Sequence, residues 1–197
     1  MTKKPILSYD FLNVSSTIVP DISGYGQAGV IRNYDRGGAV IAPDSLFGRP
    51  VSCIELPGGE GGGYLQAPDG VLQGNDGITV NFWVCVKSVH FHDFLFSFGT
   101  EPAFYLRMFP NRDEENDGKV RLVPCVTTGG RSQERCPDGC EIHLNRWYMV
   151  TVTLSEAGVL SCYLDGSLKT SMDRVKILPS HLENAKDCVF GNGIFAR

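Results

Sequence analysis

The chain has 197 residues, of which 42% are hydrophobic and 20% charged, and this composition is typical of a globular protein with one substantial core. A net charge of -4 argues against nucleic acid as a partner, because binding to the phosphate backbone requires clustered Lys and Arg. No apolar run approaches the roughly 20 residues of a membrane-spanning helix, and no secretion signal follows Lys3 and Lys4, so we expect neither a membrane partner nor a leader. One domain over residues 1–197 is expected.

The first third of the chain alternates between short strands and loops rich in glycine. Residues 8–12 (SYDFL) and 51–56 (VSCIEL) have the composition of strands, whereas residues 21–29 (DISGYGQAG) contain turn-forming residues typical of a loop. The glycines of residues 58–68 (GGEGGGYLQAP) lead into a further strand at Tyr64. A phosphate-binding loop is rejected here, because neither Lys-Ser or Lys-Thr nor a helix follows the glycines.

The middle of the chain predicts a series of antiparallel strands. Residues 78–86 (ITVNFWVCV) are apolar on both faces, which indicates a central strand covered above and below. Residues 94–98 (FLFSF) and 104–109 (FYLRMF) flank a turn and are expected to pair. The next strand, residues 119–127 (KVRLVPCVT), contains Pro124, which favours a sheet edge or a bulge.

Residues 146–167 (RWYMVTVTLSEAGVLSCYLDGS) are the most regular segment. Two sets of side chains alternate here with the two-residue period of a strand that has one face on the core. Tyr148, Val150, Val152 and Leu154 form one set, and Trp147, Met149, Thr151 and Thr153 form the other. A turn follows at residues 155–158, and Asp165-Gly166 supplies the backbone freedom that a tight two-residue hairpin needs. A three-stranded meander is predicted. Beyond it, only residues 179–186 (PSHLENAK) have a helical pattern, and that segment is short.

Seven cysteines fall into different settings along the chain. Four lie inside apolar strand-like runs, as free thiols of a reducing compartment do, which favours a cytoplasmic protein; they are Cys53, Cys85, Cys162 and Cys188. Cys136 and Cys140 flank the turn in CPDGC, a spacing that fits either a local disulfide or two free thiols. Zinc at Cys136, Cys140 and His143 ranks below both, because no fourth ligand is evident nearby.

Four motifs occur in a recognisable order. They are the D-x-S-G loop at Asp21, Ser23 and Gly24, the glycine-led Tyr64-Leu65, the strand containing Trp83-Val84, and the strand from Trp147 to Val152 that pairs with one ending in YLDG (residues 163–166). With this order the chain resembles the LamG-like jelly-roll group of the concanavalin A-like lectin/glucanase superfamily over almost its whole length. The resemblance implies an all-β fold, in which two antiparallel sheets pack face to face as a sandwich with very little helix.

The resemblance also carries expectations about the core and the C-terminus. The meander would be core framework, so Trp147 and Tyr163 are expected to be packing anchors rather than ligand contacts. The family usually closes with a strand reading approximately G-x-I-D-x-V-R-I-Y beside the N-terminal strand, whereas this chain ends in CVFGNGIFAR (residues 188–197). We therefore expect a domain excised from a longer protein that lacks the usual closing strand.

Glucanases of this superfamily use two carboxylates on one strand in a Glu-x-Asp-x-x-Glu pattern, since glycoside hydrolysis needs an acid and a nucleophile about 5 Å apart. No strand predicted here carries that pattern. The carboxylates of residues 112–118 (RDEENDG) lie in a polar loop, where burial cannot tune their pKa values. We expect no catalytic residues in this chain, and the resemblance is compatible with a glycoside hydrolase as the parent protein.

The same acidic cluster has a spacing used by calcium ligands, at Asp113, Glu115 and Asp117. Position twelve of a helical calcium hand would be Pro124 rather than Glu, which excludes that motif. The alternatives are a looser, lectin-type calcium site and a solvated hairpin loop, and we favour the loop.

Sugar-binding proteins stack aromatic rings on pyranose rings and place polar groups beside them, in loops over a rigid scaffold. Residues 88–93 (SVHFHD) have this composition, and four further residues could border the same face. The predicted carbohydrate-binding residues are Tyr64, His90, Phe91, His92, Asp93, Tyr105, Arg107 and Arg131. The alternative is that Phe91 caps the core and the histidines are ordinary surface residues.

Two functions from different classes follow. The first, which we prefer, is a non-catalytic, lectin-like module that binds an oligo- or polysaccharide and is accessory to a glycoside hydrolase. The second is a structural or protein-interaction domain that packs against a catalytic domain of the same parent chain, and it predicts an exposed apolar patch near the C-terminal edge. A glycoside hydrolase in its own right is third, and a buried carboxylate pair would support it.

Overall fold

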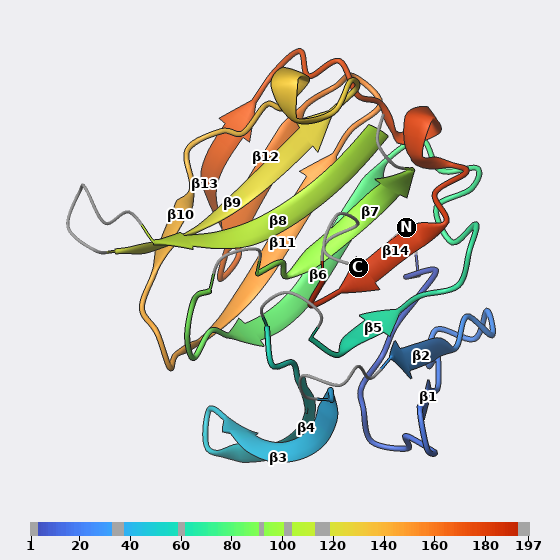
Figure 1. Cartoon of the computed structure of the whole chain (residues 1–197), viewed down its shortest axis with the longest axis vertical. Coiled ribbons are helices and arrows are strands. Elements are labelled where there is room, and N and C mark those ends of the chain that lie inside the picture. The colour runs from blue at the N-terminus through green and yellow to red at the C-terminus, as the bar shows by residue number, and fades with distance from the viewer. Residues whose placement is uncertain are drawn as a thin grey trace.

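A computed structural model describes residues 4–32, 38–58, 62–90, 93–100, 104–112 and 119–192. In this part of the chain, antiparallel strands form two sheets stacked as a sandwich and one separate hairpin, so the predicted all-β fold is confirmed (Figure 1). Figure 1 views the large sheet from its outer side, with the small sheet behind it and the hairpin at the bottom. No helix among the described residues has the length and apolarity needed to cross a membrane.

The large sheet has eight strands. In spatial order they are β1 (Ile18–Val19), β2 (Gly29–Arg32), β5 (Tyr64–Gln66), β14 (Asp187–Phe190), β7 (Phe96–Thr100), β8 (Phe104–Arg112), β9 (Val120–Thr127) and β10 (Cys140–Ile142). The small sheet has four: β13 (Ser167–Met172), β12 (Leu160–Leu164), β11 (Trp147–Leu154) and β6 (Ile78–Cys85). The separate hairpin consists of β3 (Val40–Leu46) and β4 (Arg49–Glu55). Two short 3-10 helices, η1 (Arg131–Gln133) and η2 (Pro179–Leu182), complete the described elements.

The core lies between the two sheets and is built by alternation along the strands. Phe96, Leu106 and Leu122 point inward from the large sheet and are fully buried. Val150 and Val152 point inward from β11, whose residues alternate strictly between half-buried and buried. Such alternation is expected when one face of a strand packs on a core and the other does not. Each sheet therefore has a second set of side chains that point outward, away from the core.

The predicted meander is confirmed as β11, β12 and β13. Its second turn has positive φ at both Asp165 (51°) and Gly166 (78°), the conformation of a two-residue hairpin turn. The prediction for its aromatic residues is wrong, however. Trp147 and Tyr163 lie on the outer face of the small sheet and are half-buried, because the inward positions are those of Tyr148 and Val150.

Strand β6 is an edge strand of the small sheet, not the central strand that its two apolar faces predicted. Its inward residues pack in the core as expected. Its outward residue Trp83 keeps 40% of its surface exposed, although the tip of the β3–β4 hairpin contacts it through Phe47. The outward Trp83 of β6 thus contacts a hairpin of which the sequence analysis predicted only the second strand, at residues 51–56.

Strand β14 occupies the centre of the large sheet. Val189 is paired with Gln66 of β5 on one side and with Ser97 of β7 on the other. Residues 187–190 therefore do not leave the open C-terminal edge at which an apolar patch was expected. In the described chain, β1 and β10 are the outer strands of this sheet.

The structure bears on three local predictions, for residues 8–12, for Pro124 and for residues 179–186. Residues 8–12 do not form a strand. Pro124 lies on the part of β9 beyond the end of β10, which pairs only with residues 120–122, so the predicted edge position is confirmed. Of the predicted helical segment, residues 179–186, only Pro179–Leu182 form a helical turn, the 3-10 helix η2.

Asp21 of the D-x-S-G motif connects the N-terminal segment to the loop that follows it. Its Oδ1 accepts hydrogen bonds from the backbone N–H groups of Ser8 and Ser23, both at 2.9 Å. Its Oδ2 accepts from the Ser23 hydroxyl at 2.6 Å and from the Gln27 N–H at 3.0 Å. The motif is therefore explained by its hydrogen bonding within the fold.

Candidate functional site

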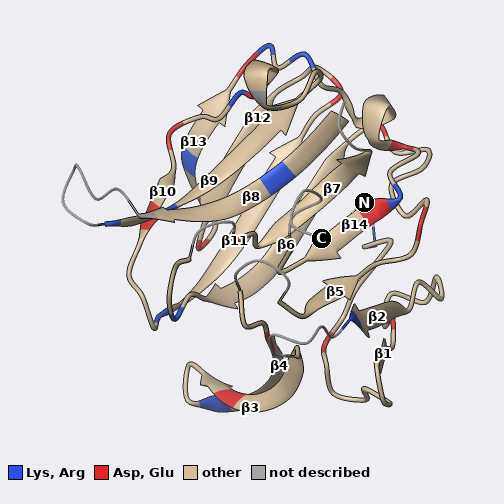
Figure 2. Ribbon diagram, in the orientation of Figure 1, with Lys and Arg blue, Asp and Glu red and all other residues tan. Residues whose placement is uncertain are grey.

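The outer face of the large sheet carries a buried arginine near its centre. Arg107 of β8 points outward because its neighbours Leu106 and Met108 point into the core, and its side chain is only 5% exposed. Figure 2 shows a basic segment in the middle of β8, beside uncharged stretches of β7 and β9. The guanidinium carbon lies 4.6 Å from the ring centroid of Tyr105, 5.0 Å from that of Phe94 and 5.6 Å from that of Phe109. At these distances the aromatic rings attract the cation and orient its plane.

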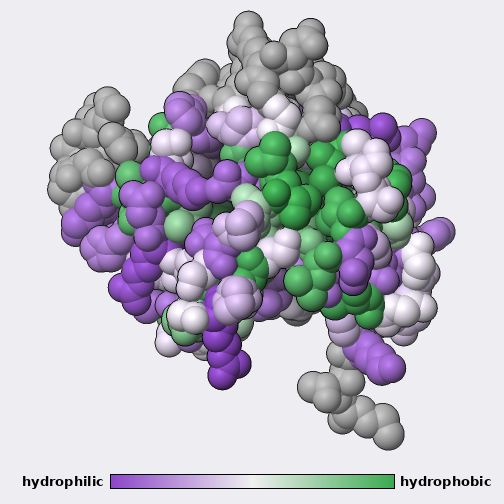
Figure 3. Space-filling view, turned by 90° about the horizontal axis from the view of Figure 1, so that it is seen from below, coloured by the Kyte–Doolittle hydropathy of each residue, from purple (hydrophilic) through white to green (hydrophobic). Residues whose placement is uncertain are grey.

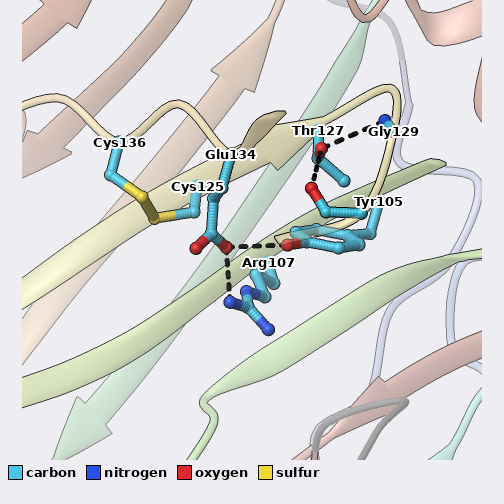
Figure 4. Close-up of polar contacts among 8 residues, drawn as sticks. Tyr105, Arg107, Cys125, Thr127, Gly129, Glu134 and Cys136 are labelled. Carbon is cyan, nitrogen blue, oxygen red and sulfur yellow. Dashed lines mark hydrogen bonds and ion pairs between the residues drawn. A yellow bond between two sulfur atoms is a disulfide. The ribbon is translucent and has the colours of Figure 1, made fainter. Parts of the chain in front are cut away.

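A carboxylate from a neighbouring loop completes the cluster. Glu134 follows η1, and its Oε1 accepts hydrogen bonds from the Tyr105 hydroxyl at 2.9 Å and from Nη2 of Arg107 (Figure 4). The Glu134 side chain is 20% exposed, whereas its two partners are almost fully buried. A buried charge is stabilised only when it is paired, so Glu134 is what permits Arg107 to lie at this depth.

The loop that bears Glu134 is fixed to β9 at three points. The Thr127 hydroxyl donates to the carbonyl of Gly130 at 2.6 Å and accepts from the N–H of Gly129 at 3.2 Å. Val126 and Arg135 exchange backbone hydrogen bonds of 3.0 and 2.9 Å. A disulfide joins Cys125 to Cys136, with 4.4 Å between their Cα atoms (Figure 4). These links hold Glu134 over β8 before any ligand binds.

This disulfide corrects the pairing considered from the sequence. Cys136 bonds to Cys125 rather than to Cys140, and Cys140 is a buried free thiol whose Sγ lies 3.3 Å from that of Cys162. The zinc set of Cys136, Cys140 and His143 is therefore not assembled. Cys125, Glu134 and Cys136 bring their ligand atoms within 4.8 Å of one another, but the disulfide leaves no thiolate there for a metal.

The structure brings Tyr105 and Arg107 together and places Tyr64 on the same face of the sheet. Paired residues share a face, and the register joins one row across four strands: Gln66, Val189, Ser97 and Arg107. Tyr64 is two residues from Gln66 on β5, so its side chain is on the same face of the sheet but outside this row. Tyr64 and Tyr105 are both buried, and their rings are therefore not the exposed stacking surfaces that the sequence analysis expected.

His90 and Asp93 lie beside this cluster, next to Phe94. The His90 backbone N–H donates to Asp93 Oδ2 at 2.7 Å, and the His90 side chain is exposed. Asp93 packs against Gly58 in the glycine-rich segment. At that glycine φ is +70°, and a Cβ would lie 2.5 Å from Asp93 Oδ1. Gly58 is thus needed because any larger residue there would collide with Asp93.

Other predicted residues lie outside the described part of the chain. They are Phe91 and His92 in the loop, and Asp113, Glu115 and Asp117 of the calcium prediction. Arg131 belongs to η1, but its side chain is likewise outside the description.

The sequence analysis missed Glu134, Phe94 and Phe109. Alternation along FYLRMF already places Tyr105, Arg107 and Phe109 on one face, so Phe109 could have been found from the sequence. Glu134 could not, because its position depends on the Cys125–Cys136 link and on a loop with no regular pattern. The arrangement offers a fixed carboxylate whose Oε1 accepts two hydrogen bonds, while no described residue donates to Oε2.

The fold has counterparts among solved structures. Domain 4 of AbnA, an extracellular GH43 arabinanase from Geobacillus stearothermophilus solved with arabinotriose, is 18% identical, with a TM-score of 0.58 over 86% of this chain and 82% of that one. The binding domain of botulinum neurotoxin DC is similar in its complexes with SialylT (14% identity, TM-score 0.61, 95% and 43% covered) and with rat synaptotagmin II (16%, 0.62, 97% and 44%). The chain therefore spans less than half of the toxin binding domain.

These likenesses show a shared fold. No match was found among curated proteins. The family described as the concanavalin A-like lectin/glucanases superfamily matches residues 58–193, which include β5 to β14 and the whole of the Arg107–Glu134 cluster. The match confirms the resemblance seen in the sequence motifs, and the chain belongs to the concanavalin A-like lectin/glucanases superfamily.

Proposed function

We propose that this chain is a non-catalytic carbohydrate-binding module, and that Glu134 accepts a hydrogen bond from a sugar hydroxyl. The observation that carries the proposal is the carboxylate held by Tyr105 and Arg107, with a second oxygen to which no described residue donates. Ligand sites typically combine a few fixed polar groups with aromatic side chains. Here the rings of Phe94, Tyr105 and Phe109 surround the Arg107 guanidinium, which holds Glu134 in place. The arabinotriose and SialylT complexes of proteins with this fold support the ligand class.

The central strands of the large sheet speak against catalysis. The central strands β7, β8 and β9 contain no Asp or Glu, so they cannot supply the paired strand carboxylates that glycoside hydrolysis in this superfamily uses. Glu134 lies on a loop and is ion-paired with Arg107, which suits a hydrogen-bond acceptor. His90 and Asp93, beside Phe94, would then border the ligand on its exposed side.

A glycan array in calcium-containing buffer tests the proposal, followed by calorimetry with any glycan that binds. Replacing Glu134 by Gln keeps the shape but removes the charged acceptor, which should weaken binding about tenfold or more. Glu141→Gln is the matched control, because Glu141 lies on β10 and pairs with Lys119 at the surface. A blank array with folded protein would refute the function; unchanged affinity in Glu134→Gln would refute the site alone.

A second function is favoured by the β3–β4 hairpin, which lies outside the residues matched by the family. Exposed apolar residues gather on the side of the molecule seen in Figure 3, which looks from below at the end where Figure 1 places this hairpin. An open groove of about 490 Å³ on the hairpin is lined mainly by Leu12, Ile41, Pro43, Pro50 and Val51. Exposed apolar patches commonly mark protein interfaces.

This second candidate is a domain that packs its hairpin against the apolar face of a catalytic neighbour. The apolar patch is at the hairpin instead of the C-terminal edge. Hydrogen exchange across residues 40–55 tests it, measured on this chain alone and in a polypeptide that also carries the neighbouring domain. Protection only in the longer polypeptide would support the interface, and equal exchange in both would contradict it.

A further inference from the structure

The outer face of the small sheet carries both tryptophans of the chain. Trp83 of β6 is paired with Met149 of β11, and Trp147 is paired with Cys85, so both indoles point away from the core. Large aromatic side chains usually contribute to cores, where they bury the most area. Here Trp83 is 40% exposed and Trp147 is half-buried, so neither indole is fully used for packing.

Three of the four strands on this face are uncharged, and the fourth, β13 (SLKTSM), carries the exposed Lys169 at the edge of the sheet. Strands β6 (ITVNFWVC), β11 (WYMVTVTL) and β12 (LSCYL) contain no Asp, Glu, Lys or Arg, although a fifth of the chain is charged. Asn81, Thr151 and Tyr163 form one row across these three strands. Asn81 Nδ2 donates to Thr151 Oγ1 at 2.6 Å, which leaves the amide oxygen and the threonine hydroxyl hydrogen for a ligand.

Phe47 extends the aromatic surface from the neighbouring hairpin. It occupies the first position of the β3–β4 turn with φ of 51°, followed by Gly48 at 74°. Such turns favour Asn or Gly at this position, and a bulky side chain with positive φ is uncommon. The Phe47 ring is 79% exposed, and its centroid lies 5.4 Å from that of Trp83 at an interplanar angle of 82°. Phe47 is therefore an exposed aromatic residue at a turn position that is unfavourable for it.

We infer that this face is a second glycan-binding surface, for a neutral oligosaccharide. Trp83 and Phe47 stack on one sugar ring, and Asn81 and Thr151 bind the hydroxyl groups of the adjoining ring. The side chains of β6, β11 and β12 offer hydroxyl, amide and indole groups and no charge, which complements a neutral sugar better than an anionic glycan. The inference rests on the proposed function, but its residues are on the opposite side of the sandwich from Glu134.

Tryptophan fluorescence reports on this face selectively, because the chain has no tryptophan elsewhere. The purified chain is titrated with arabinotriose, xylohexaose, cellohexaose and laminarihexaose, with sialyllactose as the charged comparison, and calorimetry records total binding. We expect a neutral oligosaccharide to change the emission of wild-type protein and of Glu134→Gln equally. Trp83→Ala should weaken the affinity of this surface about tenfold, equivalent to about 1.4 kcal/mol.

Phe47→Asn separates binding from folding. Asn-Gly is a favoured pair for the turn, so this variant should fold as well as the wild type and still lose at least about half of its affinity for the neutral sugar. Calorimetric binding that Glu134→Gln abolishes, with tryptophan emission unchanged, would overturn this inference and leave the proposed function standing. Binding to none of the probes in either assay, and a blank array, would overturn both.

Discussion

Removing the carboxylate of the Arg107–Glu134 pair should destabilise the fold strongly, because it takes the counter-charge from a buried guanidinium. In Glu134→Ala the Arg107 guanidinium, 5% exposed, loses its counter-charge, and the Tyr105 hydroxyl loses its acceptor. Breaking a buried pair from one side costs about 3–5 kcal/mol, and the partial exposure of Glu134 places this case near about 3 kcal/mol. For a domain of this size that corresponds to a fall in Tm of about 6–12 °C.

Urea denaturation and calorimetry of Glu134→Ala check the magnitude, with Glu141→Ala as the control. Glu141 and Lys119 are both nearly half exposed, so their pair should contribute at most about 1 kcal/mol. Replacing both members, in Arg107→Met with Glu134→Leu, removes the buried charge together with its carboxylate and should restore most of the stability. A loss in Glu134→Ala no larger than in Glu141→Ala would refute the view that this carboxylate compensates a buried charge.

Three further predictions concern other parts of the fold. Burial tends to raise the pKa of Asp21, but hydrogen bonds from Ser23, Gln27 and Ser8 outweigh it and hold the pKa well below its usual 3.8. The stabilisation by ionised Asp21 is therefore present above about pH 4 and lost on acidification. Asp21→Ala should lower the free energy of unfolding by about 2–3 kcal/mol and weaken its fall below pH 4. An unchanged fall of the free energy of unfolding below pH 4 would contradict this. Burial raises the pKa of Cys188 to about 12, so iodoacetamide at pH 8 should leave Cys188 unmodified in native protein and alkylate it in denaturant, as mass spectrometry would show. The Cys125–Cys136 disulfide spans 11 residues of sequence, so replacing both cysteines by Ser should lower the free energy of unfolding by about 2–3 kcal/mol, and a loss below about 0.5 kcal/mol would argue against its formation.

The strands and their turns could be predicted because their signals are local. The β11–β12–β13 meander depends on two-residue alternation and on Asp165-Gly166, and both are visible in a short window of sequence. Alternation along FYLRMF likewise puts Tyr105 and Arg107 on one face of a strand, although the sequence analysis did not use it there. It failed for Trp83 and Trp147, because alternation says which residues share a face and not which of the two faces is covered.

The remaining features of the site depend on contacts between distant segments. Glu134 meets Arg107 across 27 residues, and Cys136 meets Cys125 instead of the nearer Cys140. Phe47 reaches Trp83 from a hairpin that forms a sheet of its own. Turn chemistry within CPDGC suggested the wrong disulfide partner, because the bridge between Val126 and Arg135 brings Cys136 back to β9.

The central position of β14 has a consequence for the order of assembly. On one side β1, β2 and β5 form a group, and on the other β7 to β10 form another; β14 is the strand that joins them. Its partners at residues 64–66 and 96–100 leave the ribosome long before residues 187–190 do. Both groups must therefore wait with unpaired edges during synthesis, and pairing over such long separations is slow. Until that last insertion the nascent chain exposes two sheet edges on which chaperones, or other copies of the chain, can act.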